Sequence, residues 1–291
     1  MKKQSVGMLG LGIMGSAMAA NLLRAGFSVV GYDPLAACRA RHRKAGGIAV
    51  ESASEVACSA GIIITSLPSA DALARVAKEI SGGRHRRLVV VETSTLPIEV
   101  KEAARRRLAA AGVTLLDCPL SGTGAQARAK DLVVYGSGDL AAFRRTTPVL
   151  RGFSRAHYYL GKFGNGSKMK FAANLLVAIH NVSTAEAVIL ARRSGLDPAL
   201  AVKVLGDGAG SSRMLQVRGP LMVRRAYLPA TVTNETWRKD MRIIGEFVRR
   251  VKSPAPLFSA TKAIYRAALA QGRTQQDTAS VCAVLESRRG K

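Results

Sequence analysis

Hydrophobic and polar positions change their spacing along this chain of 291 residues. As far as about residue 160, short apolar runs alternate with longer stretches in which apolar residues recur at helical spacing. Strands alternating with helices, among them helices at residues 70–80 and 98–111, predict a mostly parallel α/β sheet covered on both faces. The expected strands are residues 6–9, 27–32, 61–65, 88–92, 113–117, 132–135 and 156–160.

Beyond Gly161 the strand pattern disappears. Residues 168–195 predict one long helix that is apolar on nearly every side, a character typical of a helix buried between two bodies. Asp197 and Pro198 are the N-cap and first-position residues of another helix. Further helices are predicted at residues 235–252, 255–271 and 276–288, so the second part of the chain is expected to be all-α.

A glycine-rich turn connects the first predicted strand to the first predicted helix. Gly10 permits a tight turn, Gly12 lets the backbone approach a pyrophosphate, and Gly15 lets the helix pack closely on the strand. After that helix comes the strand at 27–32, which ends at Asp33, where a carboxylate can accept hydrogen bonds from an adenosine ribose. This order of elements predicts a Rossmann-type dinucleotide-binding domain.

The first helical turn, at Ile13 and Met14, offers N–H groups and the positive end of the helix dipole to the phosphates. Asp33 repels a 2′-phosphate and favours NAD, whereas Arg39 and Arg41 could accept the 2′-phosphate of NADP. NAD is therefore the expected cofactor, with NADP possible. We expect the Rossmann-type domain at residues 1–163 and the all-α domain at 164–291, with residues 164–195 as the connecting helix.

The N-terminus also imitates a secretory signal peptide, with Lys2 and Lys3 before an apolar stretch and the sequence Ala17-Met18-Ala19 at its end. Four glycines interrupt that stretch, and cleavage would remove the strand and turn that Asp33 completes. No uninterrupted apolar segment is long enough to span a bilayer, and the four cysteines are scattered without metal-ligand spacing. We expect a cytoplasmic protein with reduced cysteines and no metal site.

The formal net charge of +25 is unusual for a dinucleotide-binding enzyme. It could indicate nucleic-acid binding, but the basic residues occur in short groups that are not interleaved with aromatic residues. We favour a solvated surface that also attracts an anionic cofactor and substrate. The groups are Arg39/Arg41/Arg43/Lys44, Arg84/Arg86/Arg87, Arg105/Arg106/Arg107, Arg192/Arg193, Arg224/Arg225 and Arg249/Arg250/Lys252.

Two loops after predicted strands could face a bound dinucleotide, because ligands collect at the carboxyl ends of strands in open α/β sheets. Leu67 and Pro68 form either a plain turn or a wall beside the ribose or nicotinamide. Thr95 could cap the next helix and could also present its hydroxyl to the nicotinamide ribose.

A third loop follows the strand at 113–117. Ser121 offers a hydroxyl, and the N–H groups around Gly122 and Thr123 are expected to be free, so that together they suit a carboxylate. A simple connecting loop is the alternative.

Lys170 and Asn174 stand four residues apart on one face of the long helix. A lysine on an apolar, buried helix is costly unless it has a role or a partner. Burial and nearby cations such as Lys168 and Lys239 disfavour the charged form of an amine, which could then exchange a proton with a substrate hydroxyl as hydride leaves the same carbon. The alternative is a lysine that extends to solvent at the domain boundary.

Taken in order along essentially the whole chain, these motifs resemble those of the β-hydroxyacid dehydrogenase family, to which 6-phosphogluconate dehydrogenase belongs. The resemblance implies that Lys170 and Asn174 are the catalytic pair and that the loop from Ser121 to Thr123 holds the substrate carboxylate. It implies that Lys239 and Asp240 belong to a segment that closes over the nicotinamide and the substrate. The cofactor contacts implied by motif and resemblance together are Gly10, Gly12, Ile13, Met14, Gly15, Asp33, Leu67, Pro68, Thr95, Lys239 and Asp240.

The chain departs from the family pattern at three places. Thr123 replaces the second glycine of the usual Ser-Gly-Gly loop, and Lys130-Asp131 stands where a Gly-Thr pair is usual. Ala173 stands where many members carry a second asparagine. These differences leave the substrate open but not the type of reaction, and Lys170 argues against the imine reductases that resemble this family, because they lack the lysine.

The sequence thus predicts an NAD(P)-dependent oxidoreductase that acts reversibly on the β-hydroxyl of a small carboxylic acid resembling 3-hydroxyisobutyrate or tartronate semialdehyde. The alternatives are an imine or other small-carbonyl reductase, and a non-catalytic protein of the same fold that binds nucleic acid through its basic surface. We expect a small anionic hydroxy-acid substrate and no membrane partner. The apolar helix from Lys168 further suggests a homodimer or homotetramer.

Overall fold

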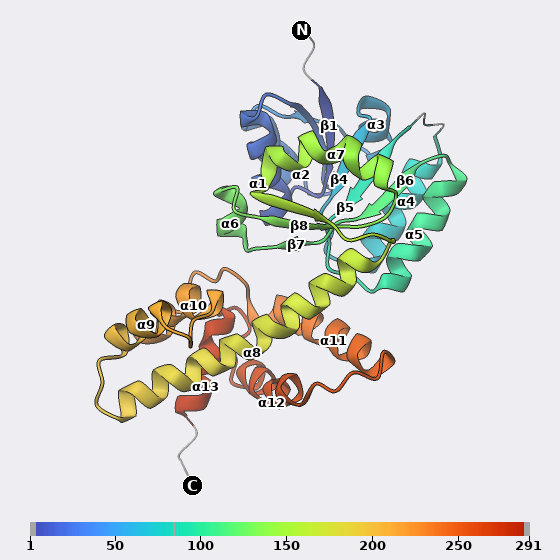
Figure 1. Ribbon diagram of the computed structural model, residues 1–291. Coiled ribbons are helices and arrows are strands. Elements are labelled where there is room, and N and C mark those ends of the chain that lie inside the picture. The colour runs from blue at the N-terminus through green and yellow to red at the C-terminus, as the bar shows by residue number, and fades with distance from the viewer. Residues whose placement is uncertain (1–3, 84, 86, 288–291) are drawn as a thin grey trace. The chain divides into compact units, whose positions relative to one another are not determined.

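The computed structural model describes residues 4–83, 85 and 87–287 (Figure 1). The chain forms two compact units, unit 1 (Met1–Lys170) and unit 2 (Phe171–Lys291), and each is described by itself below. Lys2, Lys3, Arg84 and Arg86, which entered the sequence predictions, lie outside the described residues, as does Arg288 at the end of the last predicted helix.

Unit 1 contains a six-stranded parallel sheet in the order β3-β2-β1-β4-β5-β6. Its central strands are continuous apolar runs that are buried along almost their whole length, as expected where helices cover both faces. The predicted parallel sheet is confirmed. Only β3 was not expected, because two residues are too few to form a pattern. The strands are β1 (Ser5–Leu9), β2 (Ser28–Tyr32), β3 (Ile48–Ala49), β4 (Ile62–Thr65), β5 (Val89–Glu92) and β6 (Thr114–Asp117).

Helices cover both faces of this sheet and bury two separate apolar clusters against it. One cluster contains residues of α1 (Ile13–Arg24), α2 (Ala36–Lys44), α6 (Gly124–Arg128) and α7 (Leu140–Phe153). The other contains residues of α3 (Ala53–Ser59), α4 (Ala70–Ser81) and α5 (Ile98–Ala110). With helices on both faces, the loops that follow the strands emerge at the edge of the sheet formed by the carboxyl ends of the strands.

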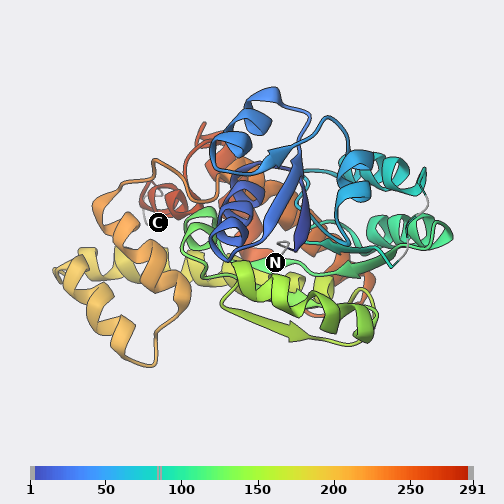
Figure 2. The same ribbon diagram turned by 90° about the horizontal axis from the view of Figure 1, so that it is seen from above.

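A second, three-stranded sheet of unit 1 was not separated from the first by the sequence pattern. It consists of β7 (Leu120–Ser121), β8 (Val133–Gly136) and β9 (Ala156–Tyr159), with β8 and β9 parallel and β7 antiparallel. Helix α7 runs beside β9, as Figures 1 and 2 show. A bridge between Asp117 and Ser137 ties this sheet to the end of β6, so the loop after β6 is held on both sides.

The rest of the chain is helical, as predicted. Helix α10 was not expected, because Gly219 and Pro220 interrupt its helical pattern. The helix predicted at 276–288 is a 3-10 turn followed by a short α-helix. The elements are α8 (Asn165–Arg193), α9 (Pro198–Asp207), α10 (Arg213–Arg224), α11 (Asn234–Arg250), α12 (Pro256–Ala270), η1 (Thr278–Ser280) and α13 (Val281–Glu286).

Helix α8 is continuous across the boundary between the two units. The expectation that it is buried on nearly every side is wrong for Met169, Leu176 and Leu190, which are 43%, 50% and 70% exposed among the described residues. By length and composition alone α8 could cross a membrane, and 44% of its most apolar 18-residue window is buried. The core helices of soluble proteins pass the same test, so this is weak support for a membrane span.

Candidate active site

The glycine turn after β1 has the geometry that the sequence predicted. Gly10 has φ of +90°, and a Cβ atom there would lie 2.3 Å from the Ser66 carbonyl oxygen. A Cβ on Gly15 would lie 1.9 Å from the Gly10 carbonyl oxygen. Both positions therefore exclude a side chain, and the turn closes tightly against the end of β4 and the start of α1.

Gly12 differs from these two, because a Cβ there would meet no atom within 4 Å. It is the N-cap of α1, no side chain caps the first turn, and that turn contains no acidic residue. Ile13, the first helical residue, is 72% exposed. The pyrophosphate of a dinucleotide could therefore approach the Gly12 backbone closely and accept hydrogen bonds from the uncapped N–H groups of the first helical turn.

Asp33 lies at the carboxyl end of β2 and is 8% exposed. Its Oδ2 accepts a hydrogen bond from the Leu11 N–H at 2.8 Å, and its Oδ1 accepts one from the Leu35 N–H at 2.9 Å. The carboxylate is thus fixed directly beside the glycine turn. Each carboxylate oxygen has a further lone pair, so both can still accept from ribose hydroxyls.

Hydrogen bonds join the loops after β4 and β5 to each other and to the carboxyl end of β1. Ser66 N–H donates to the Leu9 carbonyl at 2.9 Å, and Leu67 N–H donates to Ser94 Oγ at 2.8 Å. The N-cap of α5 is Pro97, and no side chain caps that helix. Thr95 therefore does not serve as the cap that the sequence suggested, because the N-cap lies two residues later. Leu67, Pro68 and Thr95 all follow strands at the carboxyl edge of the sheet, and Leu67 Cδ2 would lie 3.4 Å from a Cβ on Gly10.

A buried charge cluster lies beneath these loops, and sequence reasoning missed it. The Lys101 cluster consists of Glu92, Lys101 and Asp117, whose side chains are all 0% exposed. Lys101 Nζ lies 2.7 Å from Glu92 Oε2 and 2.8 Å from Asp117 Oδ1. Glu92 and Asp117 are direct partners in the register of β5 and β6. The single ammonium therefore lies between two carboxylates that would otherwise repel each other.

The electrostatics of the Lys101 cluster favour a charged lysine. Burial acts to lower the pKa of Lys101, but Asp117 and Glu92 outweigh it and hold that pKa above its ordinary value. The sequence did contain a signal for this site. Lys101, Ala104 and Leu108 share the buried face of α5, so the lysine occurs where an apolar residue is expected.

The same cluster holds the start of α8. Asp117 Oδ2 accepts from the Ser167 N–H at 2.7 Å, and Asp117 Oδ1 accepts from Ser167 Oγ at 2.8 Å. The N–H of Gly166 donates to Ser137 Oγ at 2.9 Å. Lys170 follows Ser167 within one helical turn and is 9% exposed, so its backbone is positioned by contacts that begin at Lys101.

The start of α6, directly after the loop from Ser121 to Thr123, packs against the start of α1, since a Cβ on Gly124 would lie 2.5 Å from Ile13 Cγ2. Thr123 is the N-cap of α6, and it forms a capping box with Gln126. Its N–H donates to Gln126 Oε1 at 3.0 Å. The expectation that this N–H is free is therefore wrong, because a polar residue three positions later accepts it.

Unit 2 brings together three of the predicted residues. Asn174 Nδ2 donates to Asp240 Oδ2 at 3.0 Å, which fixes the orientation of the amide. Lys239 Nζ lies 3.8 Å from Asp240 Oδ1. Asn174 on α8 and the Lys239-Asp240 pair on α11 thus form one polar group.

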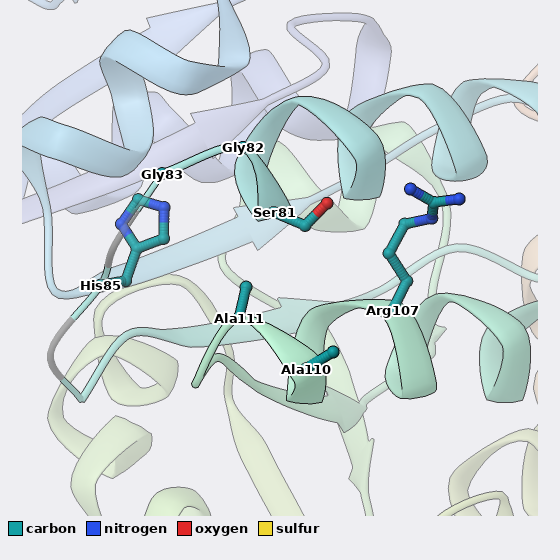
Figure 3. A pocket seen from close by; sticks show the side chains of 7 residues that line it. All are labelled: Ser81, Gly82, Gly83, His85, Arg107, Ala110 and Ala111. Atoms are coloured by element: carbon teal, nitrogen blue, oxygen red, sulfur yellow. The ribbon is translucent and has the colours of Figure 1, made fainter.

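A hollow of about 790 Å³ lies elsewhere in unit 1 (Figure 3). It is lined by residues that precede β5 and β6, so it opens at the amino edge of the sheet, opposite the glycine turn. Ligands of parallel sheets bind at the carboxyl edge, so this hollow is not part of the candidate site. Its lining residues are Ser81, Gly82, Gly83, His85, Arg107, Ala110 and Ala111. Within the described ranges, no three His, Cys, Asp or Glu side chains are grouped to hold a metal ion.

The strand order, the tight glycine turn and the carboxylate at the end of β2 define a dinucleotide-binding domain of the kind found in nicotinamide-dependent oxidoreductases. Comparison with family models agrees. Residues 5–161 match the NAD binding domain of 6-phosphogluconate dehydrogenase, and residues 164–285 match the NAD-binding domain of NADP-dependent 3-hydroxyisobutyrate dehydrogenase. The chain belongs to the β-hydroxyacid dehydrogenase family.

Individual relatives match over nearly the whole chain. L-threonate dehydrogenase of Cupriavidus necator is 30% identical over 286 residues, which are 97% of this chain and 96% of the relative. The structure of a 3-hydroxyisobutyrate dehydrogenase from Mycobacterium tuberculosis with L-serine has a TM-score of 0.88 at 26% identity and covers 98% of this chain and 100% of its own. An imine reductase from Pseudomonas sp. has a TM-score of 0.67 at 19% identity, with 98% of this chain and 100% of that one covered, and it shows the fold alone.

These comparisons support the main functional prediction over both alternatives. The protein is an NAD(P)-dependent oxidoreductase of the kind that acts on the CH–OH group of hydroxy acids. They give no support to a nucleic-acid-binding protein or to an imine reductase.

Proposed function

We propose that the protein interconverts a small β-hydroxy carboxylic acid and its carbonyl form, with Lys170 as the proton-transferring group. The observation that carries the proposal is the placement of Lys170, a 9%-exposed lysine on a helix whose first turn is fixed by Asp117. Because that turn is fixed, the backbone of Lys170 has a defined position from which its amine can act. The family resemblance of the chain supports the same assignment.

In the oxidative direction, Lys170 Nζ in its neutral form accepts the proton of the substrate hydroxyl while the C–H electron pair leaves the same carbon. A bound nicotinamide supplies the acceptor for that hydride. The products are a C=O group, a protonated lysine and the reduced cofactor, so protons and electrons balance. In the reductive direction the Lys170 ammonium returns the proton to the carbonyl oxygen.

The other site residues are proposed to bind and orient the substrate and the dinucleotide. Asn174, its amide held by Asp240, is proposed to hydrogen-bond the reacting hydroxyl, and Lys239 to attract the anionic substrate. Since the N–H of Thr123 already donates to Gln126, the carboxylate is proposed to bind the Ser121 hydroxyl and the Gly122 N–H. Gly10, Gly12, Ile13, Met14, Gly15 and Asp33 are proposed to hold the dinucleotide, with Leu67, Pro68, Thr95 and Asp240 as further contacts.

The decisive experiment replaces Lys170 and compares it with a lysine on the same turn. Lys170→Ala should reduce kcat by about a thousandfold or more, because general acid–base catalysis is lost. Lys168→Ala is the matched control, since Lys168 is exposed and only two residues away. NADH binding, followed by fluorescence, should be unchanged in both variants. Turnover retained by Lys170→Ala would refute the assignment.

The substrate is best identified by a screen of small hydroxy acids that follows nicotinamide absorbance. L-threonate and 3-hydroxyisobutyrate are the first choices, because they are named for the relatives above. Activity on acids whose only hydroxyl is β, such as 3-hydroxyisobutyrate, without activity on acids whose only hydroxyl is α is expected; L-threonate carries both hydroxyls and does not by itself distinguish them. The reverse preference would contradict the proposal.

We also propose that the protein is a homodimer or homotetramer in which a second copy covers α9. Helix α9 has no buried residue, although it carries Leu200, Val204 and Leu205, which are 57%, 60% and 36% exposed. Leu190 and Leu196, immediately before it, are 70% and 62% exposed. Such a contiguous apolar surface is typical of an interface.

Light scattering after gel filtration tests this assembly: the wild type should run as a dimer or tetramer, and Val204→Lys should run as a monomer. A monomeric wild type would contradict the proposal. We place the protein in the cytoplasm, a location supported by its four free cysteines, three of which are buried.

A further inference from the structure

Glu51 lies beside Asp33 at the carboxyl edge of the sheet. Strands β2 and β3 are parallel, with Gly31 opposite Ala49, and each carboxylate lies two residues beyond that pair. The N–H of Val50 continues the ladder by donating to the Gly31 carbonyl at 3.1 Å. Glu51 thus reaches the same end of the sheet as the carboxylate assigned to the adenosine ribose.

Glu51 binds two arginines of α2. Arg39 Nη2 lies 2.6 Å from Glu51 Oε2, and Arg43 Nη2 lies 3.3 Å from Glu51 Oε1. Arg39 is also fixed from the other side, because its Nη1 donates to the carbonyl oxygens of Asp33 at 2.8 Å and Pro34 at 3.2 Å. The Arg39 side chain is only 16% exposed, whereas that of Glu51 is 61% exposed.

This arrangement bears on which dinucleotide can bind. An arginine next to the carboxylate at the end of β2 is the group that accommodates the 2′-phosphate of NADP, and a guanidinium can bind a phosphate through two charge-assisted hydrogen bonds. Arg39 is in that location, as its contact with the Asp33 carbonyl shows. Its outward nitrogen, Nη2, is occupied by Glu51. Arg41, the other candidate from the sequence, points to Cys38 Sγ at 3.0 Å.

We propose that Glu51 is a specificity-determining residue that withholds Arg39 and Arg43 from a 2′-phosphate and so favours NAD over NADP. It acts in two ways: it neutralises both guanidinium groups, and it adds a second negative charge beside Asp33. The inference rests on the proposed binding of the adenosine ribose at Asp33, but not on the hydroxy-acid chemistry at Lys170.

The test is a fluorescence titration of NADH and NADPH into the full-length wild type and into Glu51→Gln. The amide keeps the shape of Glu51 but loses its charge, so Arg39 and Arg43 become available. The Kd for NADPH should fall about tenfold, as expected for charge-assisted hydrogen bonds gained by a phosphate. The Kd for NADH should change less than about threefold, because NADH has no group that meets these arginines.

Glu102→Gln is the matched control. Glu102 also pairs with an arginine near the surface of unit 1, Arg105 at 2.7 Å, but it lies on α5. This variant removes the same charge and should leave the ratio of the two Kd values unchanged. Adding Arg39→Gln to Glu51→Gln should abolish the gain in NADPH affinity.

Two results would overturn the inference. Equal changes in both Kd values for Glu51→Gln would show that Glu51 does not discriminate, and would leave the proposed enzyme intact. Failure of the wild type to bind either dinucleotide would remove the site at Asp33 and the inference with it. A loss of turnover on hydroxy acids alone would not affect the result, because the titration contains no substrate.

Discussion

Among the residues that the structure describes, each of the two units contains a buried ionic cluster, and the two clusters are built in opposite ways. In unit 1 a single cation, Lys101, serves two carboxylates. In unit 2 a single carboxylate, Asp277, pairs with Arg218 at 3.1 Å and also accepts hydrogen bonds from Thr231 N–H, Thr231 Oγ1 and Ala279 N–H at 2.8, 2.7 and 3.0 Å. Neutral donors are present in both clusters, such as Ser167 for Asp117, but the unit 2 anion pairs with its own cation, whereas the two unit 1 anions share one.

The clusters also differ in what they connect. Asp277 joins α10 to the loop before α11 and to η1, all within the helical unit. The Lys101 cluster joins the ends of β5 and β6 to the first turn of α8, which leads to Lys170. Its loss is therefore expected to affect catalysis as well as folding, whereas loss of the Asp277 cluster should affect folding alone.

The largest effect is expected from removing the central cation of unit 1. Lys101→Met leaves Glu92 and Asp117 buried without a partner charge, which should lower the free energy of unfolding by about 3–5 kcal/mol. Arg218→Met should lower it less, by about 2 kcal/mol, because only one carboxylate, Asp277, loses its charged partner there, whereas two carboxylates lose theirs in Lys101→Met. Urea denaturation of both variants measures the difference. An equal decrease in the free energy of unfolding for the two substitutions would contradict the expected difference between the clusters.

A smaller effect should separate positioning from stability. Ser167→Ala removes the hydroxyl bonded to Asp117, and Thr231→Val removes the hydroxyl bonded to Asp277. Each should lower the free energy of unfolding by about 1 kcal/mol. Only Ser167→Ala should also lower kcat, with the NADH Kd unchanged, because it loosens the helix that carries Lys170. A normal kcat for Ser167→Ala would show that the cluster supports the fold alone.

The smallest effect is a difference in pH dependence. Burial acts to raise the pKa of Asp277, but Arg218, Thr231 and Ala279 outweigh it and hold that pKa below its ordinary value of 3.8. The stability that Asp277 confers is therefore present above about pH 3.8 and is lost as the pH falls below it. Lys101 has a raised pKa, so its contribution is present below about pH 10.5 and is lost only in stronger alkali.

The chain's one tryptophan, Trp237, is buried in unit 2 and reports on that unit by fluorescence. Between pH 5 and pH 3, the urea midpoint followed by this signal should fall more for the wild type than for Asp277→Asn. Equal slopes in the two proteins would contradict the assigned direction of the pKa shift.

Much of this architecture follows from local pattern. The buried strands are continuous apolar runs, and Gly10 and Gly15 are required by close backbone contacts, so the nucleotide-binding half could be predicted. The two-residue strands β3 and β7 are too short to show a hydrophobic pattern, and Pro220 interrupts the helical pattern of α10. Their positions depend on tertiary pairing, which a single sequence does not display.

The residues of the candidate site differ in the same way: some could be predicted from the local sequence, and others could not. Asp33 could be predicted from its spacing after the glycine turn, and Asn174 from its spacing after Lys170 together with the family resemblance. The Lys101 cluster could not, because its three members come from two strands and a helix, and only Lys101, on the buried face of α5, stands out in its own segment. The expectation of a free Thr123 N–H failed because Gln126, three residues later, accepts it in a capping box.

The unbroken course of α8 between the two units has a mechanical consequence. Lys170 and Asn174 belong to one helical rod, and four residues of α-helix advance about 6 Å along its axis. The backbone spacing between the lysine that we propose to transfer the proton and the asparagine is therefore set by the hydrogen bonds of that helix, and not by the packing of loops.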